Sequence, residues 1–133
     1  MGHEARCSGD KLLYADEVFR LQGAIYEVNR EMGAGFLEAV YQECLALEFA
    51  GRKIPFVAAP VLSIKYKGRP LQKTYVPDFV CFGKITIELK ALGALTSEHR
   101  AQVLNYLKAS GMRLGLLVNF GSAPKAQIER LVR

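Results

Sequence analysis

Hydrophobic residues in the first part of the chain recur at helical spacing. Apolar side chains of residues 16–32 alternate steps of three and four: Val18, Leu21, Ile25, Val28 and Met32. This spacing predicts an amphipathic helix, which Gly33 can end in a left-handed cap. A second helix is predicted over residues 35–52, with Gly51 as its stop and a packing stripe of four residues: Leu37, Val40, Cys44 and Leu47.

From residue 61 the hydrophobic pattern changes to that of strands. Residues 61–68 and 71–83 are β-like, with a turn at residues 67–70 between them, and residues 84–92 follow at once as a third strand. Pro77 cannot donate to a strand ladder. We therefore expect the second of these strands to be irregular, or to lie at an edge, at that point.

Helical signals return after the third strand. Thr96 or Ser97 can cap a helix over about residues 97–110, which Gly111 then closes. Residues 113–120 predict a fourth strand that is apolar enough to lie inside a sheet. Residues 124–133 predict a short closing helix.

The predicted order of elements is α-α-β-β-β-α-β-α. Three strands joined by tight turns, and a fourth reached through a helix, make a mixed four-stranded sheet flanked by helices. The predicted fold class is α/β in the broad sense and α+β more strictly. A chain of 133 residues corresponds to about one domain. We assign residues 16–133 to a single domain that follows an N-terminal tail of residues 1–15.

Composition narrows the class of protein. Hydrophobic residues make up 50% of the chain and charged residues 23%, which is typical of a globular protein. No apolar run approaches the roughly 20 residues that a bilayer span needs. Since the polar N-terminus also shows no secretory signal, we expect a cytoplasmic protein without a membrane partner. The three cysteines form no disulfide or zinc motif, so Cys44 and Cys81 are expected to be small core residues.

Charge is distributed unevenly along the chain, whose net charge is +5. Residues 1–50 hold 4 Lys and Arg against 9 Asp and Glu, a balance of −5, while residues 51–133 hold 14 against 4, a balance of +10. A strongly basic half fits a polyanion partner, most often nucleic acid. Basic surfaces also occur for solubility alone.

The strand predicted over residues 84–92 has one apolar and one polar face, because side chains alternate along a strand. The apolar face has three members: Ile85, Ile87 and Leu89. The polar face has three others: Thr86, Glu88 and Lys90. A solvent-facing ion pair between Glu88 and Lys90, which stabilises a protein little, is one explanation of this pattern.

A second carboxylate, Asp78, occupies the preceding apolar strand. A three-residue connection over residues 82–84 would pair Cys81 with Ile85, and therefore Asp78 with Glu88 on one face. A two-residue turn would place the two carboxylates on opposite faces, and we expect the first arrangement. Paired carboxylates repel one another unless a proton or a cation lies between them.

A hard divalent cation would explain such a pair. Mg²⁺ prefers oxygen ligands and is usually held by one or two carboxylates together with a substrate phosphate. Lys90 would then lie beside the metal, where it could activate a water molecule and stabilise charge on a phosphate.

The arrangement of Asp78 followed by Glu88-Leu89-Lys90 resembles the PD-(D/E)xK nuclease superfamily, whose fold is a restriction-endonuclease-like core. Residues 35–41, with the sequence GFLEAVY, also match the motif of the GxxExxY protein family within that superfamily. Gln102 and Tyr106 resemble the QxxxY motif of RecB-like nucleases. Their i, i+4 spacing places both on one side of a helix.

The resemblance implies a set of roles. Glu38, Asp78 and Glu88 would hold Mg²⁺ or Mn²⁺, with Asp78 and Glu88 also belonging to the catalytic group. The remaining catalytic residues would be Lys90, which positions or activates water, and Gln102, which orients it. Nucleic-acid contacts are expected from four side chains: Tyr41, Arg100, Tyr106 and Lys108. In the plainer interpretation Glu38 is a surface glutamate, Tyr41 is a core tyrosine and Gln102 lies at a helix boundary.

The leading hypothesis is a metal-dependent nuclease that hydrolyses phosphodiester bonds of DNA, with RNA as the second choice, by means of a metal-activated water. The alternative is a nucleic-acid-binding or protein-interaction module that keeps the nuclease fold without turnover. A homodimer or a protein partner is compatible with either hypothesis.

Overall fold

The computed structural model describes residues 12–133, so most of the tail predicted over residues 1–15 lies outside the described residues. Within them the chain forms three helices and seven strands. The helices are α1 (Ala15–Met32), α2 (Glu38–Gly51) and α3 (Ser97–Ser110). The strands are β1 (Phe56–Ala58), β2 (Leu62–Tyr66), β3 (Arg69–Tyr75), β4 (Phe79–Cys81), β5 (Ile85–Lys90), β6 (Leu114–Asn119) and β7 (Gln127–Val132).

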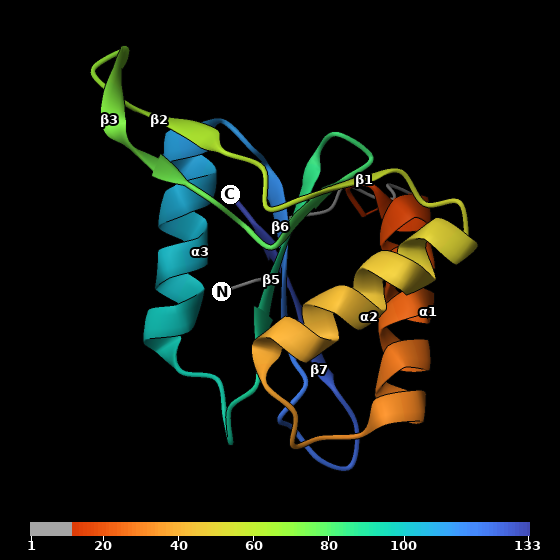
Figure 1. Ribbon diagram of the computed structural model, residues 1–133. Helices are drawn as coiled ribbons and strands as arrows, with labels where there is room; N and C mark the ends of the chain where they lie inside the picture. The colour runs from red at the N-terminus through yellow and green to blue at the C-terminus, as the bar shows by residue number, and fades with distance from the viewer. Residues whose placement is uncertain (1–11) are drawn as a thin grey trace.

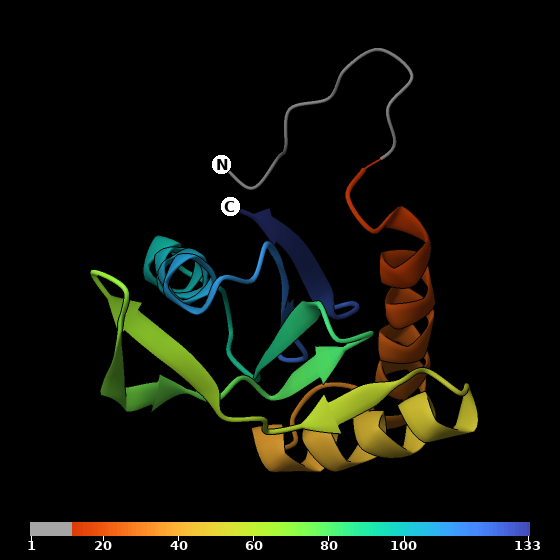
Figure 2. The ribbon, with the colours of Figure 1, turned by 90° about the horizontal axis from the view of Figure 1, so that it is seen from above.

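Five of the strands form one mixed sheet in the order β1-β4-β5-β6-β7. Only β5 and β6 run parallel, because α3 carries the chain from one to the other, and the remaining neighbours are antiparallel. α1 and α2 lie on one side of this sheet and α3 lies on the other (Figures 1 and 2). The predicted class, a mixed sheet flanked by helices, is confirmed.

The alternation of side chains along β5 and β6 divides the core into two layers. One layer lies between the sheet and α1 and α2, and it includes Ile85, Ile87 and Leu89 of β5. The smaller layer lies beneath α3, where Val103 and Leu107 pack against the other face of β6 and β7. β6 is buried along its whole length, as its apolar sequence predicts.

The connection between β4 and β5 has the predicted length. Cys81 pairs with Ile85 across a turn of residues 82–84, in which Phe82 and Gly83 have positive φ values of 56° and 70°. The ladder between the two strands ends at Phe79 and Ile87. The polar face of β5 is therefore directed toward α3, and Asp78 lies just beyond the last paired residue.

β2 and β3 form a separate two-stranded hairpin beside α3 (Figure 1). Lys67 and Gly68 make its turn, with φ values of 49° and 77°, as the turn predicted at residues 67–70 requires. The chain leaves the hairpin after Tyr75 and joins the main sheet at Phe79. The irregularity expected at Pro77 is this passage from one sheet to another.

Four details of the sequence prediction are corrected, and the main sheet has five strands where four were predicted. Residues 71–83 form two strands in different sheets, and β1 adds a strand that was not predicted. The closing helix over residues 124–133 is wrong, because residues 127–132 pair with β6 as the edge strand β7. The stripe predicted for α2 is also wrong, since Leu37 and Leu47 are 78% and 71% exposed. Its buried side chains are instead Tyr41, Leu45 and Phe49.

The predicted caps of α3 are confirmed, whereas the left-handed cap predicted for α1 is not. Thr96 caps α3 and Gly111 ends it with a left-handed φ of 81°. Gly33 ends α1 with a positive φ, but its ψ of −173° differs from that of a left-handed cap. None of the helices over residues 12–133 is both long and apolar enough to cross a bilayer.

Candidate active site

The structure brings Asp78 and Glu88 together at the end of the β4–β5 ladder. The backbone N–H of Leu89 donates to Asp78 Oδ2 at 2.7 Å, which fixes one oxygen of that carboxylate. The Tyr75 hydroxyl donates to Glu88 Oε2. The other oxygen of each carboxylate has no hydrogen-bond donor within residues 12–133, so both remain able to bind a cation.

Burial raises the pKa of both carboxyl groups. The pKa of Glu88 is raised to about 7, first by burial and then by the negative charges of Asp78 and Glu38. The Tyr75 hydroxyl and Lys90 act in the opposite direction on Glu88. Burial also raises the pKa of Asp78, against the effects of the Leu89 amide and Lys90. The pair is therefore electrostatically unsatisfied, as expected of a site prepared for a cation.

Glu88 and Lys90 line a cavity of about 240 Å³ between the end of β3 and α3. Gln102 and Tyr106 enter the same cavity from α3. The predicted catalytic residues Glu88, Lys90 and Gln102 therefore share one space. Asp78 adjoins Glu88 without lining this cavity.

The chain around Lys90 is held firmly in place. Lys90 pairs with Asn119 of β6, and the Lys90 carbonyl accepts from Phe120 N at 2.9 Å. The buried Asn119 side chain accepts from Leu92 N at 2.9 Å and donates to Leu92 O at 3.0 Å. This amide fixes the direction in which the chain leaves β5 and limits the mobility of the lysine backbone.

Glu38 and Tyr41 have different environments although they lie one turn apart on α2. Glu38 is exposed at the start of the helix, where its charge still raises the pKa of Glu88. Tyr41 is 0% exposed and its ring stacks on Phe120 at a centroid distance of 4.3 Å. The expected nucleic-acid contact of Tyr41 is therefore corrected, because a fully buried phenol cannot reach a ligand.

Tyr41 instead anchors the loop before α2. Its hydroxyl donates to Gly33 O at 2.5 Å and accepts from Phe36 N at 3.3 Å. Within this loop Gly35 has a φ of 112°, a conformation that L side chains rarely adopt. The glycine and the tyrosine of the motif thus shape the segment that presents Glu38.

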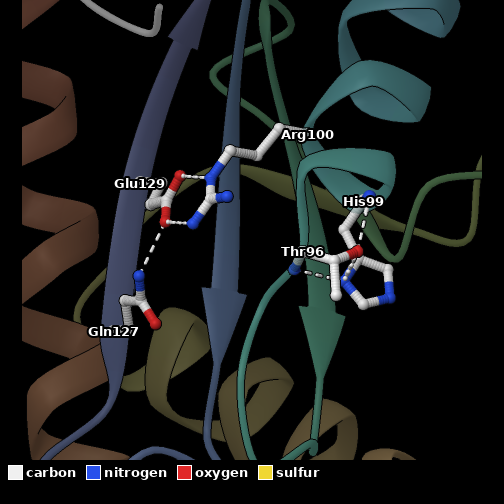
Figure 3. A network of polar contacts seen from close by, with 5 residues as sticks. All are labelled: Thr96, His99, Arg100, Gln127 and Glu129. Atoms are coloured by element: carbon white, nitrogen blue, oxygen red, sulfur yellow. Dashed lines mark hydrogen bonds and ion pairs between the residues drawn. The ribbon is translucent and has the colours of Figure 1, made fainter.

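Arg100 does not join the site. Its guanidinium forms a bidentate ion pair with Glu129 of β7, at 2.5 and 2.7 Å, and Gln127 donates to the same carboxylate (Figure 3). β7 lies two strands from β5 in the sheet. The structure therefore gives Arg100 a role in holding α3 against the sheet, which differs from the predicted nucleic-acid contact.

His99 and Lys108 lie near opposite ends of α3. The His99 ring accepts from the Thr96 backbone N–H at 3.0 Å and completes a capping box (Figure 3). His99 also borders the cavity at Glu88. Lys108 is exposed near the other end of the helix, facing the β2–β3 hairpin. Among the predicted contact residues, Tyr106 is thus the one that lies at the cavity of Glu88 and Lys90.

The described residues fit a cation that is completed by its substrate. Within residues 12–133 no three His, Cys, Asp or Glu side chains converge into a metal-binding cluster, so the predicted trio of Glu38, Asp78 and Glu88 is not a closed cage. Two adjacent carboxylates with raised pKa values are nevertheless the donor set that Mg²⁺ uses together with phosphate oxygens and water.

Tyr75 is a site residue that the sequence analysis missed. It is 4% exposed, donates to Glu88, and stacks on Tyr106 at a centroid distance of 4.4 Å. Burial, followed by the charge of Glu88, raises its pKa, so the phenol stays protonated and continues to donate. Its position three residues before Asp78, at the start of the chain passage to β4, is the signal that could have revealed it.

Comparison with known protein families agrees with this geometry. The family model for the PD-(D/E)XK nuclease superfamily matches residues 15–131, which include all the site residues above and the whole sheet except Val132, the last residue of β7. Comparisons with curated proteins and with solved structures gave no significant match. On the evidence of the match, the chain belongs to the PD-(D/E)XK nuclease superfamily.

Proposed function

We propose that this protein is a nuclease that uses Mg²⁺ or Mn²⁺ to hydrolyse phosphodiester bonds, with DNA as its substrate in preference to RNA. The observation that carries the proposal is the half-buried pair of Asp78 and Glu88, of which Glu88 lines the cavity under α3 together with Lys90. Family membership supports the reaction class. The basic balance of residues 51–133 supports a polyanionic substrate.

Asp78 and Glu88 would hold the divalent cation, and the exposed carboxylate of Glu38 would add negative charge on its open side. When bound, the cation supplies Lewis-acid polarisation of the phosphate and of water. The Leu89 amide and the Tyr75 hydroxyl keep one oxygen of each carboxylate fixed, so the free oxygens of Asp78 and Glu88 are oriented before the metal arrives.

Lys90 would act on the substrate side of the site. Its ammonium lies on the same face of β5 as Glu88, where it can orient the attacking water and stabilise negative charge on a phosphate oxygen. The Gln102 amide, across the same cavity, would position that water or Lys90 by hydrogen bonding. Water is largely excluded from the sheet side because β5 is backed by the buried core.

The GxxExxY motif suggests the branch of the superfamily. Buried Tyr41, the positive φ of Gly35 and the placement of Glu38 give each motif position a distinct physical role. We therefore also propose membership in the GxxExxY family. The test is to substitute Gly35, Glu38 and Tyr41 one at a time and to compare the stability and the cleavage activity of each variant with those of the parent.

The reaction is tested with purified protein and labelled DNA and RNA, incubated with Mn²⁺, Mg²⁺ or EDTA. We expect the parent to cleave, and we expect EDTA, Asp78→Ala and Lys90→Ala each to abolish cleavage. Mn²⁺ should still raise the melting temperature of the Lys90→Ala variant, because that variant keeps both carboxylates. Glu43→Gln, which removes an exposed carboxylate of α2, is the matched control and should cut normally. Cleavage that persists unchanged in the Lys90→Ala variant contradicts the assigned chemistry, and absence of cleavage by the parent favours a non-catalytic module.

A further inference from the structure

The β2–β3 hairpin carries a concentration of positive charge that the proposed chemistry does not use. Four cations lie on it: Lys65, Lys67, Arg69 and Lys73. No Asp or Glu occurs between Glu48 and Asp78 in the sequence. None of the four cations forms an ion pair within residues 12–133, whereas Arg30, Arg52, Lys84 and Arg100 all do.

The hairpin contributes little to the folded core. It forms its own sheet, and six of the seven residues of β3 are exposed. Tyr66 and Leu71 are also largely exposed, at 61% and 44%. In both views the hairpin extends beside α3 and away from α1 and α2 (Figures 1 and 2). Its charge is therefore not explained by packing within the chain.

A continuous groove runs between this hairpin and α3. It begins at the catalytic cavity and continues into a cleft of about 850 Å³, which shares His99, Gln102 and Tyr106 with that cavity. A third cleft, of about 620 Å³, shares Asn105 and Ala109 with the second and reaches Lys65. The groove thus connects Glu88 and Lys90 to the cationic hairpin.

The two walls of the groove differ in chemistry. The hairpin wall presents one cation to the groove, Lys65, which suits a phosphate, and the other three cations of the hairpin lie on the same element outside the lining. The wall on α3 presents amides and small side chains, including Gln102, Asn105 and Ala109, which suit the edges and faces of bases. Glu98 is an acid that lines the groove, at the start of the helix, and Lys108 balances it at the other end.

The length and the lining of the groove suit a single strand. β2 packs alongside α3, and residues of both elements line the groove. The 14 residues of α3 span roughly 21 Å, which corresponds to about six stacked nucleotides of one strand. Tyr106 lines the groove, and Lys65 and Lys108 line its far end. Aromatic side chains together with cations are the combination that binds single-stranded nucleic acids.

From these observations we infer that the groove between the β2–β3 hairpin and α3 binds single-stranded nucleic acid and guides it to the catalytic cavity, with the phosphates against the hairpin. The inference rests on the proposed nuclease function, because the strand must end at Glu88 and Lys90. It assigns a substrate class to this site, namely a single strand or a single-stranded end. It also assigns an orientation, with the phosphates toward the hairpin and the bases toward α3.

The test measures binding without cleavage. Labelled single-stranded DNA of about twelve nucleotides, and the duplex of the same sequence, are titrated in EDTA by fluorescence anisotropy at several salt concentrations. Two variants remove hairpin charge, Lys65→Gln with Lys73→Gln and Lys67→Gln with Arg69→Gln. Lys53→Gln with Lys125→Gln is the control, since it removes the same charge from exposed positions outside the hairpin. Thermal melts of all three variants confirm that they fold.

We expect the parent to bind the single strand more tightly than the duplex. Each hairpin variant should weaken single-strand binding at least fivefold, or more at low salt, and should reduce the slope of log affinity against log salt by about 1.4, or roughly 0.7 for each lost phosphate contact. The control variant should bind as the parent does. Hairpin variants that match the control overturn the inference, as does tighter binding of the duplex.

Cleavage measured separately in Mn²⁺ distinguishes this inference from the proposed function. If the parent binds single strands through the hairpin but does not cut them, the nuclease proposal fails and the binding groove stands. If the parent cuts DNA while the folded hairpin variants bind and cut as well as the control, the nuclease proposal stands and the groove inference fails.

Discussion

Replacing Glu88 by glutamine tests the electrostatic reasoning behind the site. The substitution keeps the size of the side chain and an oxygen that can accept from the Tyr75 hydroxyl, but it removes the charge. In the folded protein the pKa of Glu88 is raised to about 7 from an ordinary value of 4.5. Burial is the main cause, and the charges of Asp78 and Glu38 add to it.

The sign of the effect on stability follows from proton binding. Between about pH 4.5 and pH 7 the folded protein holds a proton on Glu88 that the unfolded chain has released, so stability falls as pH rises through this range. Above about pH 7 the penalty is complete. A difference of 2.5 pKa units, from 4.5 to about 7, corresponds to about 3 kcal/mol. Glu88→Gln removes this penalty, so it should stabilise the protein at pH 8 and change little at pH 4.5.

The assay is unfolding by urea or heat in EDTA across this pH range. At about pH 8 the Glu88→Gln variant should exceed the parent by up to about 3 kcal/mol, or roughly 10 °C in melting temperature. Mn²⁺ at about pH 8 should stabilise the parent, because the cation neutralises the buried charge of Glu88. It should stabilise the variant much less, because the variant lacks that charge. Glu43→Gln, on the exposed face of α2, controls for the change in net charge.

Parallel stability curves for Glu88→Gln and the parent in EDTA would refute this reasoning, since they would mean that Glu88 ionises in the folded state as easily as in the unfolded chain. A variant that is less stable than the parent at about pH 8 would refute it as well. In both cases the carboxylate pair would not be a site in need of a cation.

Three further substitutions test the surroundings of the pair. Gly115→Ala should destabilise the fold by about 1 to 3 kcal/mol in urea unfolding, because the new Cβ would lie 2.7 Å from Thr86 Oγ1 beneath α3; unchanged stability would contradict this packing. Tyr41→Phe should cost about 1 to 2 kcal/mol and reduce cleavage without changing binding to labelled DNA, since it frees the loop that presents the acid of α2. The Tyr75 hydroxyl lowers the pKa of Glu88, so Tyr75→Phe should raise that pKa and shift the pH at which Mn²⁺ begins to stabilise the protein upward in a series of melts. An unchanged pH of onset would contradict this effect of the hydroxyl on Glu88.

Much of the fold follows from local signals in the sequence. α1 and α3 have clear apolar periodicity or caps, and the turn at Lys67-Gly68 allows the positive φ values that a two-residue hairpin needs. The register of β4 and β5 was also predictable, because a three-residue turn is the connection that keeps Asp78 and Glu88 on one face. These features depend on residues close together in the chain.

The errors occur where distant contacts decide between equal local patterns. α2 is apolar on more than one side, so its sequence supports the stripe of Val40 and Cys44 as well as the buried stripe of Tyr41 and Leu45. The sequence of residues 127–132 is compatible with a helix or a strand. The backbone edge of β6 that β5 leaves unpaired selects the strand, because residues 127–132 hydrogen-bond to it. β1 has three residues, which is too short for periodicity to reveal.

The site shows the same division. The placement of Asp78, Glu88 and Lys90 was predictable because strand alternation and turn length decide it, and both are local. The partner of Arg100 was not predictable, because Glu129 lies on a strand that the sequence presented as a helix. Tyr75 was missed because its contact with Glu88 depends on the chain passing from the hairpin to the main sheet.

The GxxExxY motif combines two kinds of residue that a sequence pattern cannot separate. Tyr41 is buried and bonds Gly33 and Phe36, so it acts on the backbone of the loop and on Phe120 after β6. Glu38 is exposed, and its charge reaches Glu88. Because the Phe120 backbone N–H also donates to the carbonyl of Lys90, the buried tyrosine is linked through Phe120 to the end of β5. The motif therefore aligns α2 with the end of β5. It would serve the reaction through that alignment, and not through a contact between its buried tyrosine and the substrate.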